Sequence, residues 1–97
     1  MRFEWDEAKN RANIRKHGFD FADAEEMFRG VLLVSPDTSE DYGEERWAGL
    51  GLTGRRIAKV IFIQPFAGVI RIISLRKATK RERKEYEKTI ADGLETH

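Results

Sequence analysis

The chain has 97 residues, a net charge of +1 and no cysteine, and 36% of its residues are charged. This length favours one domain over residues 1–97, and the lack of cysteine excludes disulfides and thiolate metal sites. No apolar run approaches the ~20 residues of a membrane-spanning helix and the charged N-terminus is unlike a signal peptide, so we expect a cytoplasmic protein without a membrane partner.

Two helices are predicted in the N-terminal third of the chain. Asp6 is a suitable N-cap for a first helix that ends at His17, and Gly18 follows as the stop. A second helix is predicted over 20–30, where apolar residues recur at helical spacing. Residues 3–5 precede both helices and are compatible with a short edge strand.

The middle of the chain is rich in β-branched residues and turn residues. It predicts four strands, at 31–35, 46–53, 56–64 and 69–75. The first is followed by an acidic loop, and the other three are joined by short turns, which favours an antiparallel meander.

The C-terminal element is predicted to be a helix. It begins at Thr79, which has the capping-box spacing to Glu82, and runs to about Gly93. The predicted fold class is therefore α+β, with two N-terminal helices, a four-stranded antiparallel sheet and a C-terminal helix.

The charges are segregated along the chain. Residues 19–45 carry nine acidic groups and one basic group, whereas residues 46–75 carry five basic groups and no acidic one. Residues 76–88 carry seven basic groups and three acidic ones. This pattern is compatible with solvated faces of alternating sign. It also fits a surface with one face for a polyanion and another for a basic partner.

Two common kinds of site are not expected. Gly49, Gly51 and Gly54 spell G-x-G-x-x-G, but a β-rich run follows instead of a helix and no acidic residue occurs at 46–81, so we interpret them as strand and turn glycines. Two histidines without H-x-x-H spacing, and no cysteine, predict neither a metal site nor a cofactor.

The remaining polar residues suit cleavage of RNA without a metal. That reaction needs a base for the 2′-OH, an acid for the leaving oxygen and cations around the phosphate. Arg76 and Lys77 close the last strand, and Glu45 and Arg46 open the second. Whether these two pairs meet at one end of the sheet depends on the strand register, which the sequence leaves open.

His17 has two interpretations. A histidine just before a helix-ending glycine caps carbonyls and complements the helix dipole, and this reading is preferred. Alternatively, Asn10, Asn13 and His17 form a polar stripe that faces a site.

Five further residues are candidates for RNA binding. Trp47 is placed to stack on an unpaired base, although core packing is the preferred reading. Lys80, Arg81, Arg83 and Lys84 are placed to contact phosphates, and the alternative is a solvated helix face.

A series of short motifs runs in order along nearly the whole chain. They are Phe-Glu-Trp-Asp at 3–6, Lys-His-Gly at 16–18, Gly-Glu-Glu-Arg at 43–46, Arg-Ile-Ile-Ser at 71–74, Arg-Lys-Ala-Thr at 76–79, Arg-Glu-Arg at 81–83 and Tyr-Glu at 86–87. Together they resemble the BrnT family. The resemblance implies the toxin half of a bacterial type II toxin-antitoxin pair, with a fold similar to the RelE-like ribonucleases, that cleaves RNA and arrests growth.

The resemblance also implies partners. A small ribbon-helix-helix antitoxin, similar to BrnA, is expected to bind the toxin and cover its site, and operator DNA is expected to be bound only through that complex. A homodimer and a toxin-antitoxin heterotetramer are both compatible with it. The rival hypothesis is a binding module that acts as a corepressor with a DNA-binding partner, for which the acidic stretch 20–45 and an edge strand are suited.

We therefore predict a metal-independent endoribonuclease. Arg76, Lys77 and Arg46 are expected to hold and neutralise the phosphate. Glu45 is the candidate base and His17 the candidate acid.

Overall fold

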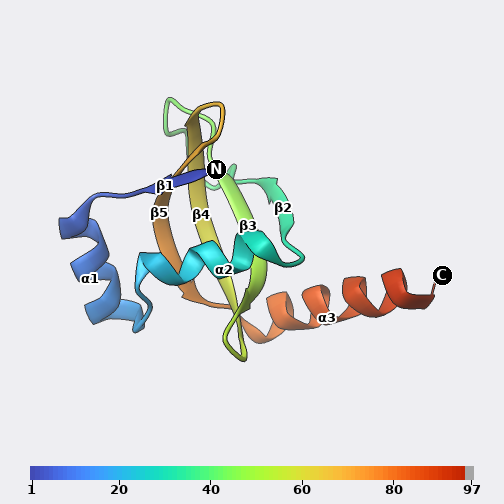
Figure 1. The fold of residues 1–97 in the computed structure, drawn as a ribbon. Helices are drawn as coiled ribbons and strands as arrows, with labels where there is room; N and C mark the ends of the chain where they lie inside the picture. The colour runs from blue at the N-terminus through green and yellow to red at the C-terminus, as the bar shows by residue number, and fades with distance from the viewer. Residues whose placement is uncertain (96–97) are drawn as a thin grey trace.

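The computed structural model describes residues 1–95 as a curved five-stranded sheet with helices around it (Figure 1). The elements in chain order are β1 (Arg2–Glu4), α1 (Glu7–His17), the 3-10 turn η1 (Phe21–Asp23), α2 (Ala24–Arg29), β2 (Leu33–Pro36), β3 (Trp47–Thr53), β4 (Arg56–Phe66), β5 (Val69–Lys77) and α3 (Lys80–Glu95). The strands lie in the order β1-β5-β4-β3-β2. No helix within residues 1–95 is long and apolar enough to cross a membrane.

The predicted sheet of four antiparallel strands behind two N-terminal helices is wrong. A fifth strand, β1, precedes α1 and pairs in parallel with β5, so the sheet is mixed. Glu4 lies opposite Arg71 in this pairing and accepts a hydrogen bond of 2.6 Å from its Nε. The second predicted helix is a 3-10 turn followed by the six-residue α2. Residues 3–5 were compatible with a short edge strand, but its parallel pairing with β5 was not predicted, because it depends on residues more than sixty positions away.

The strands β2 to β5 are antiparallel neighbours in chain order. Gly54, at φ 60°, lies in the turn after β3, and Gly68, at φ 77°, in the turn after β4. β4 runs past its predicted end, through Pro65 to Phe66, with a register irregularity between Ile63 and Phe66. Proline has no N–H to donate, which explains why the ladder is interrupted there.

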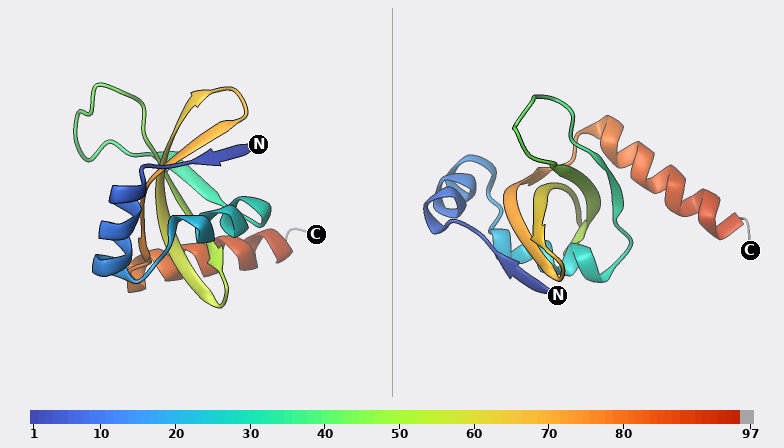
Figure 2. Two further views of the ribbon diagram at one scale, coloured as in Figure 1. Left: turned by 60° about the vertical axis from the view of Figure 1, so that its left-hand side comes forward. Right: turned by 90° about the horizontal axis from the view of Figure 1, so that it is seen from above.

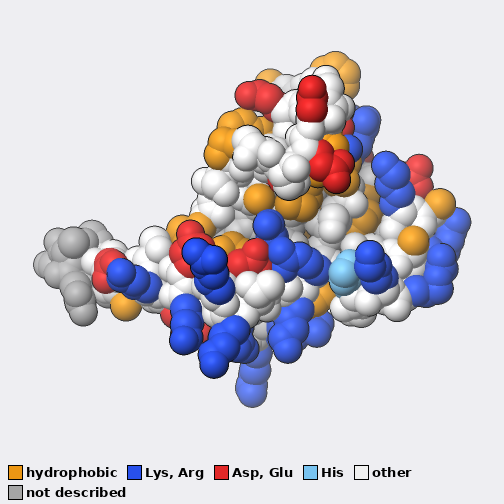
Figure 3. All heavy atoms as spheres, turned by 180° about the vertical axis from the view of Figure 1, so that it is seen from behind, with side chains coloured by type: hydrophobic (Ala, Val, Ile, Leu, Met, Phe, Trp, Pro, Cys, Tyr) orange, Lys and Arg blue, Asp and Glu red, His pale blue; other side chains and the backbone are white. Residues whose placement is uncertain are grey.

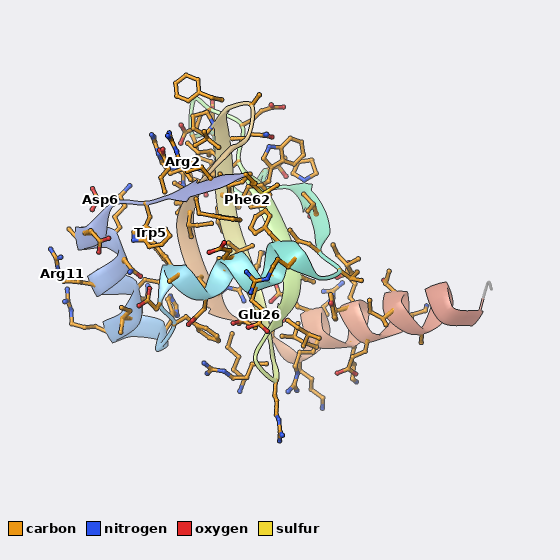
Figure 4. All side chains as sticks on the ribbon, viewed as in Figure 1. Arg2, Trp5, Asp6, Arg11, Glu26 and Phe62 are labelled. Carbon is orange, nitrogen blue, oxygen red and sulfur yellow. The ribbon has the colours of Figure 1, made fainter. Side chains whose placement is uncertain are left out.

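We call the face of the sheet that α2 crosses the front face (Figure 2). The main core lies on this face. Its buried side chains are Phe19, Phe21, Ala24, Met27, Ala58, Val60, Phe62, Ile70, Ile72 and Leu75. Phe62 points from β4 toward α2, where its ring centroid lies 5.0 Å from that of Phe28 (Figure 4).

Two strand glycines allow the chain to pack closely on this face. A Cβ added at Gly49 would lie 3.0 Å from the Leu32 side chain, and one added at Gly51 would lie 3.1 Å from it. The G-x-G segment is thus part of β3 beneath a packed leucine.

α3 and the loop 37–46 lie on the opposite face, here the back face (Figure 2). Tyr86 anchors the helix, because its ring is buried beside Leu50 and Ala78 and its hydroxyl donates to the Val31 carbonyl at 2.9 Å. The C-terminal half of α3 projects away from the sheet (Figure 1). The part of the back face between α1 and α3 therefore stays accessible.

Candidate active site

The strand register places two cations side by side on the back face. Lys59 of β4 lies opposite Arg76 of β5, while their neighbours Val60 and Leu75 point into the core on the front face. Because side chains alternate along a strand, Lys59 and Arg76 both leave the sheet on the back. Their side chains are 27% and 31% exposed, so an anion in solvent can reach them.

Glu82, in the first turn of α3, joins these two cations. Its carboxylate forms a fork with Arg76, at 2.8 Å from Nη1 and 3.0 Å from Nη2, and lies 3.4 Å from the Lys59 Nζ. The predicted capping box is also formed, since Glu82 Oε1 accepts from the Thr79 N–H at 2.9 Å. The hydrogen bonds from Arg76 are the main reason why the pKa of Glu82 falls from 4.5 to about 2. Such a carboxylate stays ionised at neutral pH and positions the cations, but is a poor general base.

Replacing Glu82 by glutamine is expected to lower the free energy of unfolding by about 1–2 kcal/mol at pH 7, after allowance for solvent screening. The folded-state pKa lies below the unfolded value, so this stabilisation is present above pH 4.5 and is lost as the pH falls toward 2. Urea unfolding of both proteins at pH 7 and pH 3 measures the difference. Glu87→Gln, exposed on the same helix, is the control, and a pH-independent loss in Glu82→Gln would contradict the linkage.

His17 lies on the same side of the molecule. As the last residue of α1 it lines a shallow hollow together with Lys16 and Ser74, and Ser74 is two residues before Arg76 on β5. Burial, the charge of Lys16 and the charge of Arg76, in that order, lower the pKa of His17 below 6.5. Viewed from behind, the histidine side chain lies among Lys and Arg side chains (Figure 3). The neutral imidazole therefore predominates at pH 7.

The other two members of the predicted polar stripe face inward. Asn13 is buried and bonds to the backbone of Phe19 and Leu75. Asn10 is buried too, and bonds to the Asp20 side chain and the Phe21 N–H. Both asparagines hold α1 in place, and Asn13 also lines the hollow beside His17.

The register separates the two pairs of predicted catalytic residues. Trp47, the first residue of β3, pairs with Phe62 of β4. Arg76 pairs with Lys59 of β4, and Lys59 pairs on its other side with Leu50, three residues after Trp47 on β3. Residues 45 and 46 thus lie at the other end of the sheet from Arg76.

Loop contacts hold Arg46 at that end. Its guanidinium stacks on the Tyr42 ring, 3.8 Å from the centroid, and its Nε lies 3.3 Å from Glu44 Oε1. Glu45 is exposed and lines the same hollow of the loop as Trp47. Trp47 is half-buried against the main core, as in the preferred reading of this residue.

Asp37 links the two ends electrostatically. Its pKa is lowered first by a hydrogen bond from Ser39, at 2.8 Å, and further by the charges of Lys59 and Arg46. The back face therefore carries the carboxylates of Asp37 and Glu82 among its cations Arg46, Lys59 and Arg76, so its positive charge is partly neutralised.

The remaining predicted cations have different surroundings. Lys77 pairs with Ala58, a core residue of the front face, so its side chain leaves the sheet on the face opposite Arg76. The predicted RNA-binding residues of α3 are all exposed; they are Lys80, Arg81, Arg83 and Lys84. Lys and Arg side chains gather along this helix and along α1 on the back of the molecule (Figure 3).

Sequence reasoning missed Lys59 and the ionic role of Glu82. Lys59 interrupts an otherwise apolar strand, Ile57 to Ile63, and this interruption is the local signal for it. Glu82 was recognised only as a capping residue. Its second role appears once α3 is docked beside β5.

The fold and this surface define a class: a small α+β protein with a cationic, partly neutralised sheet face flanked by a neutral histidine. Comparison with known proteins is more specific. The family model described as ribonuclease toxin, BrnT, of type II toxin-antitoxin system matches residues 5–82. The crystal structure of the Brucella abortus ribonuclease toxin BrnT is similar, with 35% identity and a TM-score of 0.68 over 82% of this chain and 99% of that chain. A comparison with curated proteins gives no match.

The chain belongs to the BrnT family of ribonuclease toxins. Endoribonuclease activity and an antitoxin partner follow from this membership.

Proposed function

We propose that this chain cleaves RNA without a metal ion and that the back face between α1 and α3 is the active site. The observation that supports the proposal is the grouping of Lys59, Arg76 and Glu82 beside His17 on one accessible surface. Cations held in place before substrate binds stabilise the charge that develops on a phosphate in the transition state.

The roles follow from the contacts. Arg76 presents its planar fork to the phosphate, Lys59 adds a point charge, and Glu82 orients both. His17, with its lowered pKa, takes the proton from the 2′-OH, which reverses the predicted acid role. The 2′-oxygen then attacks phosphorus and the bond to the 5′-oxygen breaks. The 5′-oxygen takes a proton from water, and the hydroxide that remains takes the proton from His17. The products are a 2′,3′-cyclic phosphate and a 5′-hydroxyl.

The other predicted residues serve the flanking nucleotides in this proposal. Arg46 and Trp47 meet the strand at the far end of the sheet, and the exposed cations of α3 contact phosphates on the other side. Glu45 stays a candidate base and Lys77 a candidate phosphate ligand. The lowered pKa of His17 favours His17 over Glu45 as the base. Because the Lys77 side chain leaves the sheet on the face opposite Arg76, Lys59 is favoured over Lys77 as the phosphate ligand.

Incubation of the purified chain with RNA in EDTA tests the proposal. We expect cleavage that leaves 2′,3′-cyclic phosphate ends. Cleavage that stops in EDTA and returns with Mg²⁺ would exclude the metal-free mechanism, and no cleavage under either condition would contradict the active-site assignment.

The pH dependence of kcat/KM is expected to report the titration of the His17 imidazole. Because the neutral imidazole is the base and its pKa lies below 6.5, activity should be constant near pH 7 and fall as the pH drops through that lowered pKa. In a His17→Gln protein the rate should be about 10²–10⁴-fold lower and this acidic limb should be absent. An unchanged limb in the variant would assign the titration to another group.

We further propose that expression of the chain alone arrests growth and that a ribbon-helix-helix antitoxin relieves the arrest by covering this surface. The acidic loop 37–46 and the outer edge of β2 suit a basic partner. Growth arrest abolished by Arg76→Ala supports the enzyme. Harmless expression with retained partner binding would instead favour the corepressor module.

A further inference from the structure

A pocket of about 180 Å³ adjoins the Lys59–Glu82 pair on the back face. Its apolar floor is formed by Leu33 of β2 and by Ala48 and Leu50 of β3. It is smaller than the roughly 300 Å³ at which sites for drug-sized ligands begin, and its size suits one planar ring system.

The pocket and the cations form one row across the sheet. Leu33 pairs with Leu50, Leu50 with Lys59, and Lys59 with Arg76. Neighbouring strands lie about 4.8 Å apart, so the apolar floor is one strand from Lys59 and two from Arg76. A nucleotide has the same layout, with a flat apolar base a short distance from its phosphate. When the phosphate contacts Arg76 and Lys59, an adjacent base meets this floor.

Two carboxylates border the pocket on the α3 side, and they differ in their availability. Both oxygens of Glu82 are occupied, by Arg76, Thr79 and Lys59. Glu85 lies one turn further along the helix, is exposed and forms no ion pair with the residues that the structure describes. Its carboxylate thus has free acceptors at the edge of an apolar pocket.

An ionised carboxylate only accepts hydrogen bonds, and its two oxygens match two parallel donors. Guanine presents such a pair, N1–H and the N2 amino group, on its Watson–Crick edge. Adenine and cytosine present one amino group beside an acceptor nitrogen. Uracil presents one N–H between two carbonyl oxygens, which the carboxylate repels.

We propose that this pocket binds the base adjoining the scissile phosphate and that Glu85 selects guanine there. The inference rests on the proposed ribonuclease function and specifies its substrate.

Cleavage of RNA oligonucleotides that differ at one position tests this selectivity. The native chain should cleave beside guanosine about 10–100-fold faster than beside the other three nucleosides, and inosine, which lacks the N2 amino group, should lose much of that advantage. Glu85→Gln should lose the preference, with its rate beside guanosine falling toward the rates beside the other three nucleosides. Glu87→Gln, on the same helix but at a different hollow, should keep it.

Equal rates at all four nucleosides, or a full guanosine preference in Glu85→Gln, would overturn the inference while leaving the ribonuclease function intact. Complete lack of cleavage by the native chain would contradict the proposed function instead. In that case, binding of the four nucleoside monophosphates to the native chain and to Glu85→Gln tests whether the pocket selects guanine. Tighter binding of guanosine monophosphate that Glu85→Gln abolishes is expected, and equal binding of all four would contradict it.

Discussion

Arg76→Ala is expected to slow RNA cleavage by about 10²–10³-fold, the usual cost of removing one group that stabilises charge in a transition state. Arg76 is the central cation of the back face, and its guanidinium is held in a two-bond fork by Glu82. Lysine at this position keeps the charge but not the fork, so Arg76→Lys should recover only part of the lost rate. Single-turnover cleavage of one RNA by the three proteins measures the effect.

A loss of this size has to be separated from a loss of folding. Among the residues that the structure describes, Arg76→Ala leaves Lys59 as the one cation paired with Glu82, so the urea unfolding of this variant should be measured beside its activity. Arg11→Ala removes an exposed cation from α1 and serves as the matched control, with cleavage close to that of the native chain. A folded Arg76→Ala protein that cleaves at the native rate would remove Arg76 from the active site.

Asn13→Asp is expected to lower the free energy of unfolding by about 3–5 kcal/mol, the range measured for an unpaired buried charge. The Asn13 Nδ2 donates to the carbonyls of Phe19 at 3.0 Å and Leu75 at 2.8 Å, and its Oδ1 accepts from the Leu75 N–H at 3.2 Å. Aspartate replaces the donor by a charged oxygen that faces two carbonyl oxygens. Because the whole domain is expected to be stable by only about 5–15 kcal/mol, this loss removes a large fraction of its stability.

Asn13→Ala separates the charge from the lost hydrogen bonds. It leaves the same backbone groups without a partner but adds no charge, so a smaller loss of about 2–3 kcal/mol is expected. Urea unfolding at pH 7 compares both variants, with Arg11→Ala as the surface control from the same helix. A loss below about 1 kcal/mol in Asn13→Asp would show that water replaces these bonds.

The position of Asn13 also bears on the active site. Its side chain ties α1 to Leu75, the residue before Arg76, and His17 lies one turn further along α1. One amide therefore sets the spacing between the histidine and the arginine. In a partly folded Asn13→Ala protein, the cleavage activity per folded molecule should therefore also be lower than in the native chain.

Local signals in the sequence predicted the ends of several elements. Asp6 caps α1 through the Lys9 N–H at 3.0 Å, and Gly18 ends it at φ 74°. The alternation of side chains predicted β3, and the Thr79 capping box predicted the start of α3. These features depend on interactions within a few residues, so the sequence by itself contains them.

The site depended on contacts between distant residues. Arg76 and His17 were singled out by type, but Lys59 gained meaning only when the β4–β5 register set it beside Arg76. The same register separated Arg46 from Arg76, and the docking of α3 brought Glu82 to both cations.

The basic stretch at 76–88 was therefore recognisable from composition alone, whereas its division into a phosphate site, an ionic clamp and a helix with exposed cations was decided by the tertiary structure. The parallel pairing of β1 with β5, which the predicted sheet lacked, was likewise decided by the tertiary structure. Strand pairing brings together residues far apart in sequence, and a shift of one residue moves every side chain to the other face.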